Sequence, residues 1–302
     1  MLSMEESDRP WLAEQTRLRE ALSVLSAPAR LEQLNERAQA ACIRTQSGQV
    51  LQFVDQSQLP AGQSYEAFIH DTGKVPTRAT GEGAVHDLYN ALMWLRWPCS
   101  KAVLNARHVT SVRGDPGGET ERTDQDPARR QRGWLRDRLT LFDESGLVWA
   151  CTDERLNAAL QGFRWHELFV ERRALLQASL TARVFGHAVL QKLERPYKAI
   201  TAHALILPDV SEESPIDLDA RLARVLALAW RHPPEPALCP LPVLGLPGWS
   251  PDNQAAGFYA DTKIFRPGRI RRLQSLSERV GRSLRVLAPG EEGPDSGGQG
   301  AG

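Results

Sequence analysis

The residues best suited to chemistry lie in one stretch, residues 81–108, where histidine, aspartate, asparagine and lysine recur among large aromatic residues. At the helical period of about 100° per residue, positions spaced by three and four share one face. One such face carries His86, Asn90, Trp94, Trp97, Lys101, Asn105 and His108. Pro98 lacks a backbone N–H and should divide the stretch into two helices, over about 84–96 and 99–109.

Metal-assisted catalysis is the chemistry that we favour for these side chains. A catalytic metal needs about three protein ligands and one open position, and neutral imidazole is the form of histidine that binds metal. The candidate ligands of a divalent metal are His86, His108, His187 and His203. The candidate catalytic residues are His86, Asp87, Asn90 and Lys101. No HExxH motif or similar spacing links the histidines, so the fold must bring them together.

Two glycines just before the first helix suggest a place for an anion. Backbone N–H groups of such a turn, at the positive end of a helix, can approach a phosphate or a carboxylate. We expect a small anionic ligand to be held by Arg78, Gly81, Gly83 and Arg136.

Two other functions fit the same residues. In a non-enzymatic binding module, Arg78, Lys101 and the glycine turn would hold a phosphate- or carboxylate-bearing ligand beside Trp94 and Trp97. In a structural protein, the polar side chains would form a buried hydrogen-bond network that fixes helix packing. We prefer metal-assisted hydrolysis of a small anionic substrate to both.

The remaining pattern predicts an α+β fold, a mainly helical single domain with a small antiparallel sheet. Apolar runs at 139–142 and 147–150 predict a hairpin. Asp143 and Glu144 lie between them. This carboxylate pair could bind a metal, but we favour a role as turn residues. We expect His187 in a helix over 183–194.

His203 should project from one face of a strand over 200–207, because side chains alternate along a strand. Residues 233–251 are rich in proline and also apolar, so they should wrap across the core as extended chain. We expect one domain over 1–287, with an exposed loop at 113–133 and a disordered tail at 288–302.

Composition excludes several classes of protein. The 302 residues carry 37 basic and 37 acidic side chains, and zero net charge argues against non-specific nucleic-acid binding. The four cysteines are far apart, which is typical of reduced thiols in a cytoplasmic protein. No targeting signal is apparent, and no window approaches the roughly 20 uncharged residues that a membrane span needs. The sequence does not indicate an oligomeric state.

Several of these segments resemble a known family. They are Tyr65-Glu66, Val75-Pro76-Thr77-Arg78, His86 to Leu92 with Trp94-Leu95, Pro98, Lys101 and Leu104-Asn105, Arg136-Asp137, Thr140 to Glu144, Phe185-Gly186-His187-Ala188, Pro242 to Gly245 and Pro247-Gly248-Trp249. Together they resemble the bacterial family labelled domain of unknown function 3025, over most of residues 10–275, with 113–133 as an insertion. The resemblance implies a proteobacterial cytoplasmic protein of one domain, and it brings no activity with it.

Overall fold

The computed structural model describes residues 16–113, 127–207, 215–230 and 238–267, all within one unit, Met1–Pro267. The α-helices are α1 (Thr16–Ser23), α2 (Ala27–Ala40), α3 (Tyr65–Thr72), α4 (Ala84–Arg96), α5 (Pro98–Arg113), α6 (Pro127–Ser145), α7 (Glu154–Gln161), α8 (Arg173–Ser179), α9 (His187–Lys192) and α10 (Pro215–Leu228). The strands are β1 (Gln52–Asp55), β2 (Lys74–Thr77), β3 (Gly146–Cys151), β4 (Leu180–Val184), β5 (Thr201–Leu207) and β6 (Cys239–Pro242). The mainly helical α+β class is confirmed.

The larger sheet has the strand order β4-β3-β5-β6. β3 pairs antiparallel with β4 and parallel with β5, and β5 pairs antiparallel with β6. A second sheet joins β1 to β2 in parallel. The larger sheet is therefore mixed and the smaller one parallel, and neither is the antiparallel sheet that the sequence predicted. The crossover connections between β1 and β2, and between β3 and β5, return the chain in the same direction.

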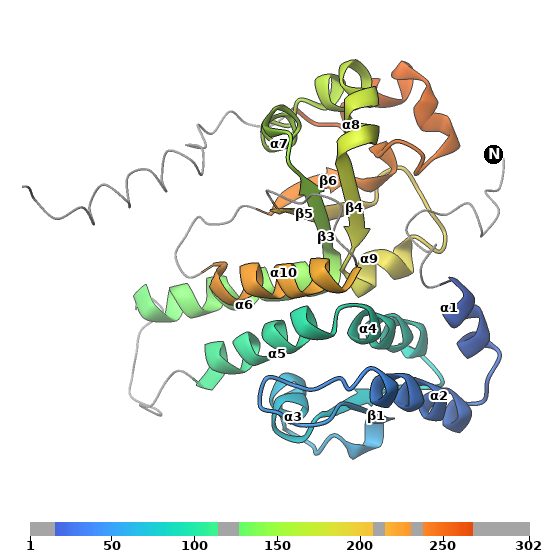
Figure 1. Cartoon of the computed structure of the whole chain (residues 1–302), viewed down its shortest axis with the longest axis vertical. Coiled ribbons are helices and arrows are strands. Elements are labelled where there is room, and N and C mark those ends of the chain that lie inside the picture. The colour runs from blue at the N-terminus through green and yellow to red at the C-terminus, as the bar shows by residue number, and fades with distance from the viewer. Residues whose placement is uncertain (1–15, 114–126, 208–214, 231–237, 268–302) are drawn as a thin grey trace, which may run out of the picture. The chain divides into compact units, whose positions relative to one another are not determined.

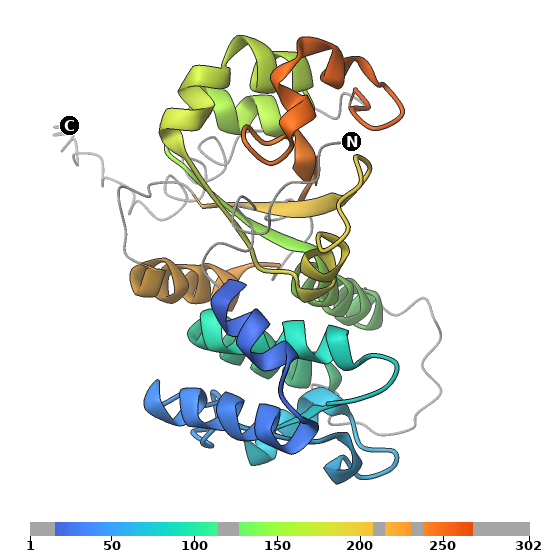
Figure 2. The same cartoon turned by 90° about the vertical axis from the view of Figure 1, so that its right-hand side faces the viewer.

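The elements form layers, which Figures 1 and 2 show from two sides. Helices α4, α5, α6 and α10 lie between the four-stranded sheet and a layer made of α2, α3, β1 and β2. Helices α7 and α8 lie at the opposite end of β3 and β4 from α6 and α9. Helices α4, α5, α6 and α9 thus meet at one end of the larger sheet.

The break between α4 and α5 occurs where the sequence predicts it, with Pro98 as the first residue of α5. Gly83 caps the start of α4 with φ 88°, and Gly81 has φ 76°. Both glycines adopt the left-handed backbone that L side chains rarely accept. Leu88, Leu92 and their buried neighbours face the core. The glycine turn is therefore required to direct the chain into α4.

The hairpin expected over 139–150 is wrong. Residues up to Ser145 belong to α6, and only Gly146–Cys151 is a strand. Leu139 and Phe142 lie one turn apart on α6, and both are fully buried. A short apolar run does not by itself distinguish a helix from a strand. Asp143 and Glu144 consequently lie in the last turn of a helix, where they point from a rigid element.

The boundaries of three other predictions differ. Residues 127–133 of the expected loop belong to α6, and 114–126 lie outside the described residues. The helix expected over 183–194 begins only at His187, because Val184 ends β4 and Gly186 is the N-cap. The domain limit at 287 and the tail at 288–302 also lie outside the described residues.

The described part of the proline-rich segment, residues 238–251, covers the core, as predicted, but part of it is a strand, and residues 233–237 lie outside the described residues. Leu241, Leu244 and Trp249 are buried. Pro240 and Pro242 fall in β6, which is the edge of the larger sheet. An edge strand tolerates proline because the missing N–H need not pair with a further strand.

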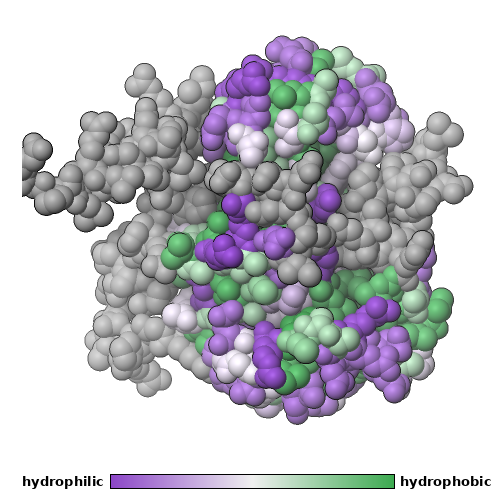
Figure 3. All heavy atoms as spheres, viewed as in Figure 1, coloured by the Kyte–Doolittle hydropathy of each residue, from purple (hydrophilic) through white to green (hydrophobic). Residues whose placement is uncertain are grey.

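The surface of the protein carries both hydrophobic and hydrophilic residues, as expected for helices that each bury one apolar side. On the face in Figure 3, hydrophobic residues are interspersed with hydrophilic ones and gather over α1 and α4. Among the described residues, no helix combines the length and the apolar character that crossing a membrane requires.

Candidate metal centre

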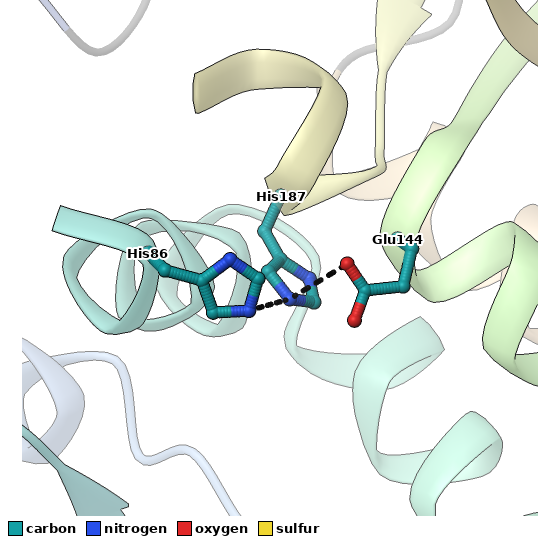
Figure 4. A group of neighbouring side chains, drawn as sticks. All are labelled: His86, Glu144 and His187. Atoms are coloured by element: carbon teal, nitrogen blue, oxygen red, sulfur yellow. Dashed lines mark hydrogen bonds and ion pairs between the residues drawn. The ribbon is translucent and has the colours of Figure 1, made fainter. Parts of the chain in front are cut away.

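Three side chains from three helices converge at one end of the larger sheet. Figure 4 shows His86 of α4, Glu144 of α6 and His187 of α9 pointing toward one another. Their ligand atoms all lie within 4.8 Å of one another. The two histidine Nε2 atoms are 3.0 Å apart, and His187 Nε2 is 3.6 Å from Glu144 Oε2. His187 is 4% exposed, whereas His86 and Glu144 are half-buried, so solvent reaches one side of the group.

Two glycines account for the closeness of His187 and Glu144. The backbone N–H groups of Phe185 and Gly186 donate to the carbonyl of Gly146, at 2.9 and 2.8 Å. A Cβ on Gly186 would lie 2.5 Å from the carbonyl oxygen of Glu144 and from two further backbone atoms of residues 145 and 146. The chain therefore enters α9 against the backbone that ends α6.

Helix α4 is joined to α9 and to the residues just after it by two contacts. His86 Nδ1 lies 3.2 Å from Oε1 of Gln191, one turn beyond His187. The hydroxyl of Tyr89 donates to Glu194 Oε1 at 2.8 Å. These contacts hold the His86 ring, which meets the His187 ring edge to face with centroids 4.5 Å apart.

The surroundings of the two rings set their tautomers. His86 Nδ1 faces the amide oxygen of Gln191, an acceptor, so Nδ1 carries the hydrogen and Nε2 has the lone pair. His187 Nδ1 is buried without a normal hydrogen bond, and the acceptor 3.8 Å from it is Asp143 Oδ2. The Nε2 atom of His187 lies 3.0 Å from the Nε2 atom of His86, a normal N–H···N distance, so without a metal His187 carries its hydrogen on Nε2 and donates it to His86. A cation bound by both Nε2 atoms would replace this hydrogen bond and leave the His187 hydrogen on Nδ1, on the side of Asp143.

Burial keeps the His187 ring neutral. Desolvation lowers its pKa to about 4, although the negative charge of Asp143 opposes this. Burial also raises the pKa of the Glu144 carboxyl, and the neighbouring charge of Asp143 raises it further. A neutral imidazole and a carboxylate destabilised by its surroundings both favour a bound cation.

A chain of buried polar groups leads away from His187. Lys101 Nζ donates to Asp143 Oδ1 at 2.5 Å and to Asn90 Oδ1 at 2.9 Å. The Asn90 amide donates to the Tyr65 hydroxyl at 2.9 Å. Burial works against the charged form of Asp143, but the positive charge of Lys101 and its hydrogen bond outweigh burial, and the pKa of Asp143 is lowered. Asp143 is therefore an anion beside His187.

Asp87 and Arg78 form a pair outside this group. The Arg78 backbone N–H and its Nε donate to Asp87 Oδ2, at 2.7 and 2.8 Å, and its Nη2 donates to Oδ1 at 2.9 Å. A Cβ on Gly83 would lie 2.6 Å from the Arg78 guanidinium. The expected anion-binding residues Arg78 and Gly83 thus contact each other, and Asp87 already neutralises the arginine.

Two of the four histidines expected at the metal do not belong to the group. His108 lies two turns beyond Lys101 on α5, about 10 Å along the helix. Burial lowers the pKa of His108. His203 lies on β5 beside Gly146, and burial and the charge of Arg138 lower its pKa. The third member of the group is instead the carboxylate of Glu144.

Glu144 and Gln191 are the residues that the sequence reasoning missed. The signal for Glu144 was the adjacent acid, Asp143, at the end of an apolar run. The signal for Gln191 was its spacing of four from His187, which places both on one face of a helix. Arg136, an expected ligand-binding residue, is exposed on α6 two turns before Asp143.

Comparison with known proteins gives a family and no activity. The model of a family described as "Protein of unknown function (DUF3025)" matches residues 51–269, a range that contains the whole three-residue group. No curated protein and no solved structure matches the chain.

Proposed function

The chain belongs to the DUF3025 family, and from the geometry of its site we propose that it is a metal-assisted hydrolase whose divalent cation is held by His86, His187 and Glu144. The observation that carries the proposal is the pair of facing Nε2 atoms, 3.0 Å apart, with a carboxylate oxygen 3.6 Å from one of them.

The spacing fits a first-row divalent ion such as Zn²⁺. With bonds of roughly 2.0–2.1 Å and tetrahedral angles, two ligand atoms of one zinc lie about 3.3 Å apart. The separations of 3.0 and 3.6 Å lie on either side of that value, and all three ligand atoms lie within 4.8 Å of one another, so a turn of the Glu144 carboxylate toward His86 would complete the set. Two histidines and one carboxylate leave a fourth position for water or substrate, as a catalytic zinc requires.

The chain contributes the surroundings of the reaction. A bound zinc would lower the pKa of its water to about 7 and polarise the substrate. His187 is buried, and solvent and substrate reach the group past His86 and Glu144. A divalent cation with Lys101, Asp143 and Glu144 sums to one positive charge, which favours an anionic substrate. Lys192 also acts on Glu144 and adds to that field.

The remaining expected residues take supporting roles in this proposal. Lys101 holds Asp143 in place and is itself held by Asn90, and Asp87 fixes Arg78 at the start of α4. Gly81 and Gly83 are needed for the backbone turn. None of these contacts points to a ligand of a binding module without a metal.

Zinc titration by calorimetry tests the metal site. We expect one Zn²⁺ per chain, bound in the native protein and removed by a chelator. His86→Gln and Glu144→Gln should each lower the affinity at least tenfold. His166→Gln is the matched control, because His166 is an exposed histidine paired only with a surface acid, Glu171.

Hydrolysis is tested with chromogenic p-nitrophenyl esters of phosphate and of carboxylic acids. The proposal expects the zinc-loaded protein to cleave an anionic ester, and the chelated protein and Glu144→Gln to lose that activity. A protein that takes up zinc and cleaves none of these esters would retain the metal site and lose the hydrolase assignment.

A further inference from the structure

A buried polar chain of Tyr65, Asn90, Lys101 and Asp143 ends at the back of the His187 ring. It joins α3, α4, α5 and α6. Lys101 is 4% exposed, and burying an ammonium group is costly unless it is paired. Packing alone needs no such chain, so its position beside His187 calls for another explanation.

We infer that Asp143, held by Lys101, is a positioning residue that orients His187 for the metal. The inference rests on the proposed metal site. Ligating histidines usually donate their second ring N–H to a carboxylate or carbonyl, which fixes the tautomer and the ring direction. Asp143 Oδ2 is 3.8 Å from His187 Nδ1, on the opposite side of the ring from Nε2.

The unmet hydrogen bond at His187 supports this role. Nδ1 is buried without a partner at normal distance, and the acceptor that faces it is about 1 Å too far for an N–H···O bond. A ring that turns toward a cation at Nε2 can close this gap. Asp143 cannot turn away, because its other oxygen is held by Lys101.

The role of Lys101 differs from that of Asp143. Its ammonium touches Asp143 and Asn90 and also lies over the Trp94 ring, 5.6 Å from the centroid. It keeps the carboxylate charged and fixed, but it does not touch His187 itself. Removal of Lys101 should therefore affect stability more than metal binding, and removal of Asp143 should affect both.

The experiment measures Zn²⁺ affinity by calorimetry and the visible spectrum of the Co²⁺-loaded protein. Asp143→Asn keeps the shape of the side chain but leaves the Lys101 charge without its partner, so its folding is checked first by circular dichroism. The double variant Asp143→Asn with Lys101→Met removes both charges and avoids that stranded ammonium. Asp153→Asn is the matched control, because Asp153 is an arginine-paired carboxylate beyond the other end of β3.

We expect Asp143→Asn and the double variant to bind Zn²⁺ 10- to 100-fold more weakly and to change the Co²⁺ bands. Lys101→Met should lower stability and weaken Zn²⁺ binding less than Asp143→Asn does, and Asp153→Asn should leave both metal readouts unchanged. A double variant that binds Zn²⁺ as tightly as the native protein overturns the inference and leaves the metal site standing. A native protein that binds no Zn²⁺ overturns the metal site and the inference together.

Discussion

Gly186→Ala is the substitution that most directly probes how the fold brings His187 to Glu144. The new Cβ would lie 2.5 Å from the carbonyl oxygen of Glu144, the Cα of Ser145 and the nitrogen of Gly146. Carbon makes comfortable contacts at about 3.5 Å or more, so the two segments must separate by about 1 Å. These are backbone atoms, which cannot rotate away as the end of a side chain can.

The expected cost follows from two opposing effects. Overpacking of this kind costs about 1–3 kcal/mol. Replacing glycine by alanine at a compatible φ restricts the unfolded chain and returns about 0.4–1 kcal/mol. Gly186 has φ −71°, which alanine accepts, so the net loss of unfolding free energy should be about 1–2 kcal/mol.

Urea unfolding and zinc titration of the same samples provide the assay. A separation of about 1 Å is also enough to loosen a metal site, so Zn²⁺ affinity should fall with stability. Gly257→Ala is the control, because a Cβ at that position would meet nothing within 4 Å and the φ of Gly257 is not in the left-handed region. The control should be neutral or slightly stabilised. If Gly186→Ala matched the control in both readouts, the close approach of α9 to the end of α6 would not be what assembles the site.

Three further predictions concern single residues. Asp87→Ala should lower the unfolding free energy by about 1–2 kcal/mol in urea, because Arg78 loses its partner while its side chain is already 46% exposed. Zinc binding should be kept. Loss of zinc binding in the folded variant would contradict the structural role of Asp87. The metal-free protein should lose up to roughly 3 kcal/mol of unfolding free energy as the pH falls from about 6.5 to about 4. The reason is that His187, with a pKa of about 4, stays neutral in the folded protein and takes up a proton in the unfolded chain. Urea midpoints that do not change across that pH range would contradict this prediction. His203→Leu removes a buried ring nitrogen that has no partner, so calorimetry should find zinc affinity unchanged; a large loss would return His203 to the ligand set.

Local signals predicted much of the fold. Pro98 marks the first residue of α5, and Gly81 and Gly83 form the turn that leads into α4. In each case the preference resides in the residue's own backbone or in its capping position. The strand β5 lies at Thr201–Leu207, where the sequence predicts a strand over 200–207.

Features decided by distant contacts were not predictable in this way. The end of α6 resembles a strand because Leu139, Thr140, Leu141 and Phe142 are apolar or β-branched, and only packing against the sheet selects the helix. The parallel pairing of β3 with β5 depends on a long connection that no local pattern reveals.

The site was predicted only in part, because its residues meet through distant contacts. His86 and His187 were both candidates by residue type, but nothing in the spacing could show that they meet 3.0 Å apart or that His108 and His203 do not join them. Glu144 was missed because its helix was interpreted as a turn.

The location of a bound zinc ion is the measurement that tests the account most directly. A crystal of the protein soaked in Zn²⁺ would be measured at the zinc absorption edge, where anomalous scattering marks the metal alone. The account predicts a peak about 2.0–2.2 Å from the Nε2 atoms of His86 and His187 and from a carboxylate oxygen of Glu144. Zinc found only at surface groups such as His70 and Asp71, with no peak between the imidazoles of His86 and His187, would contradict it.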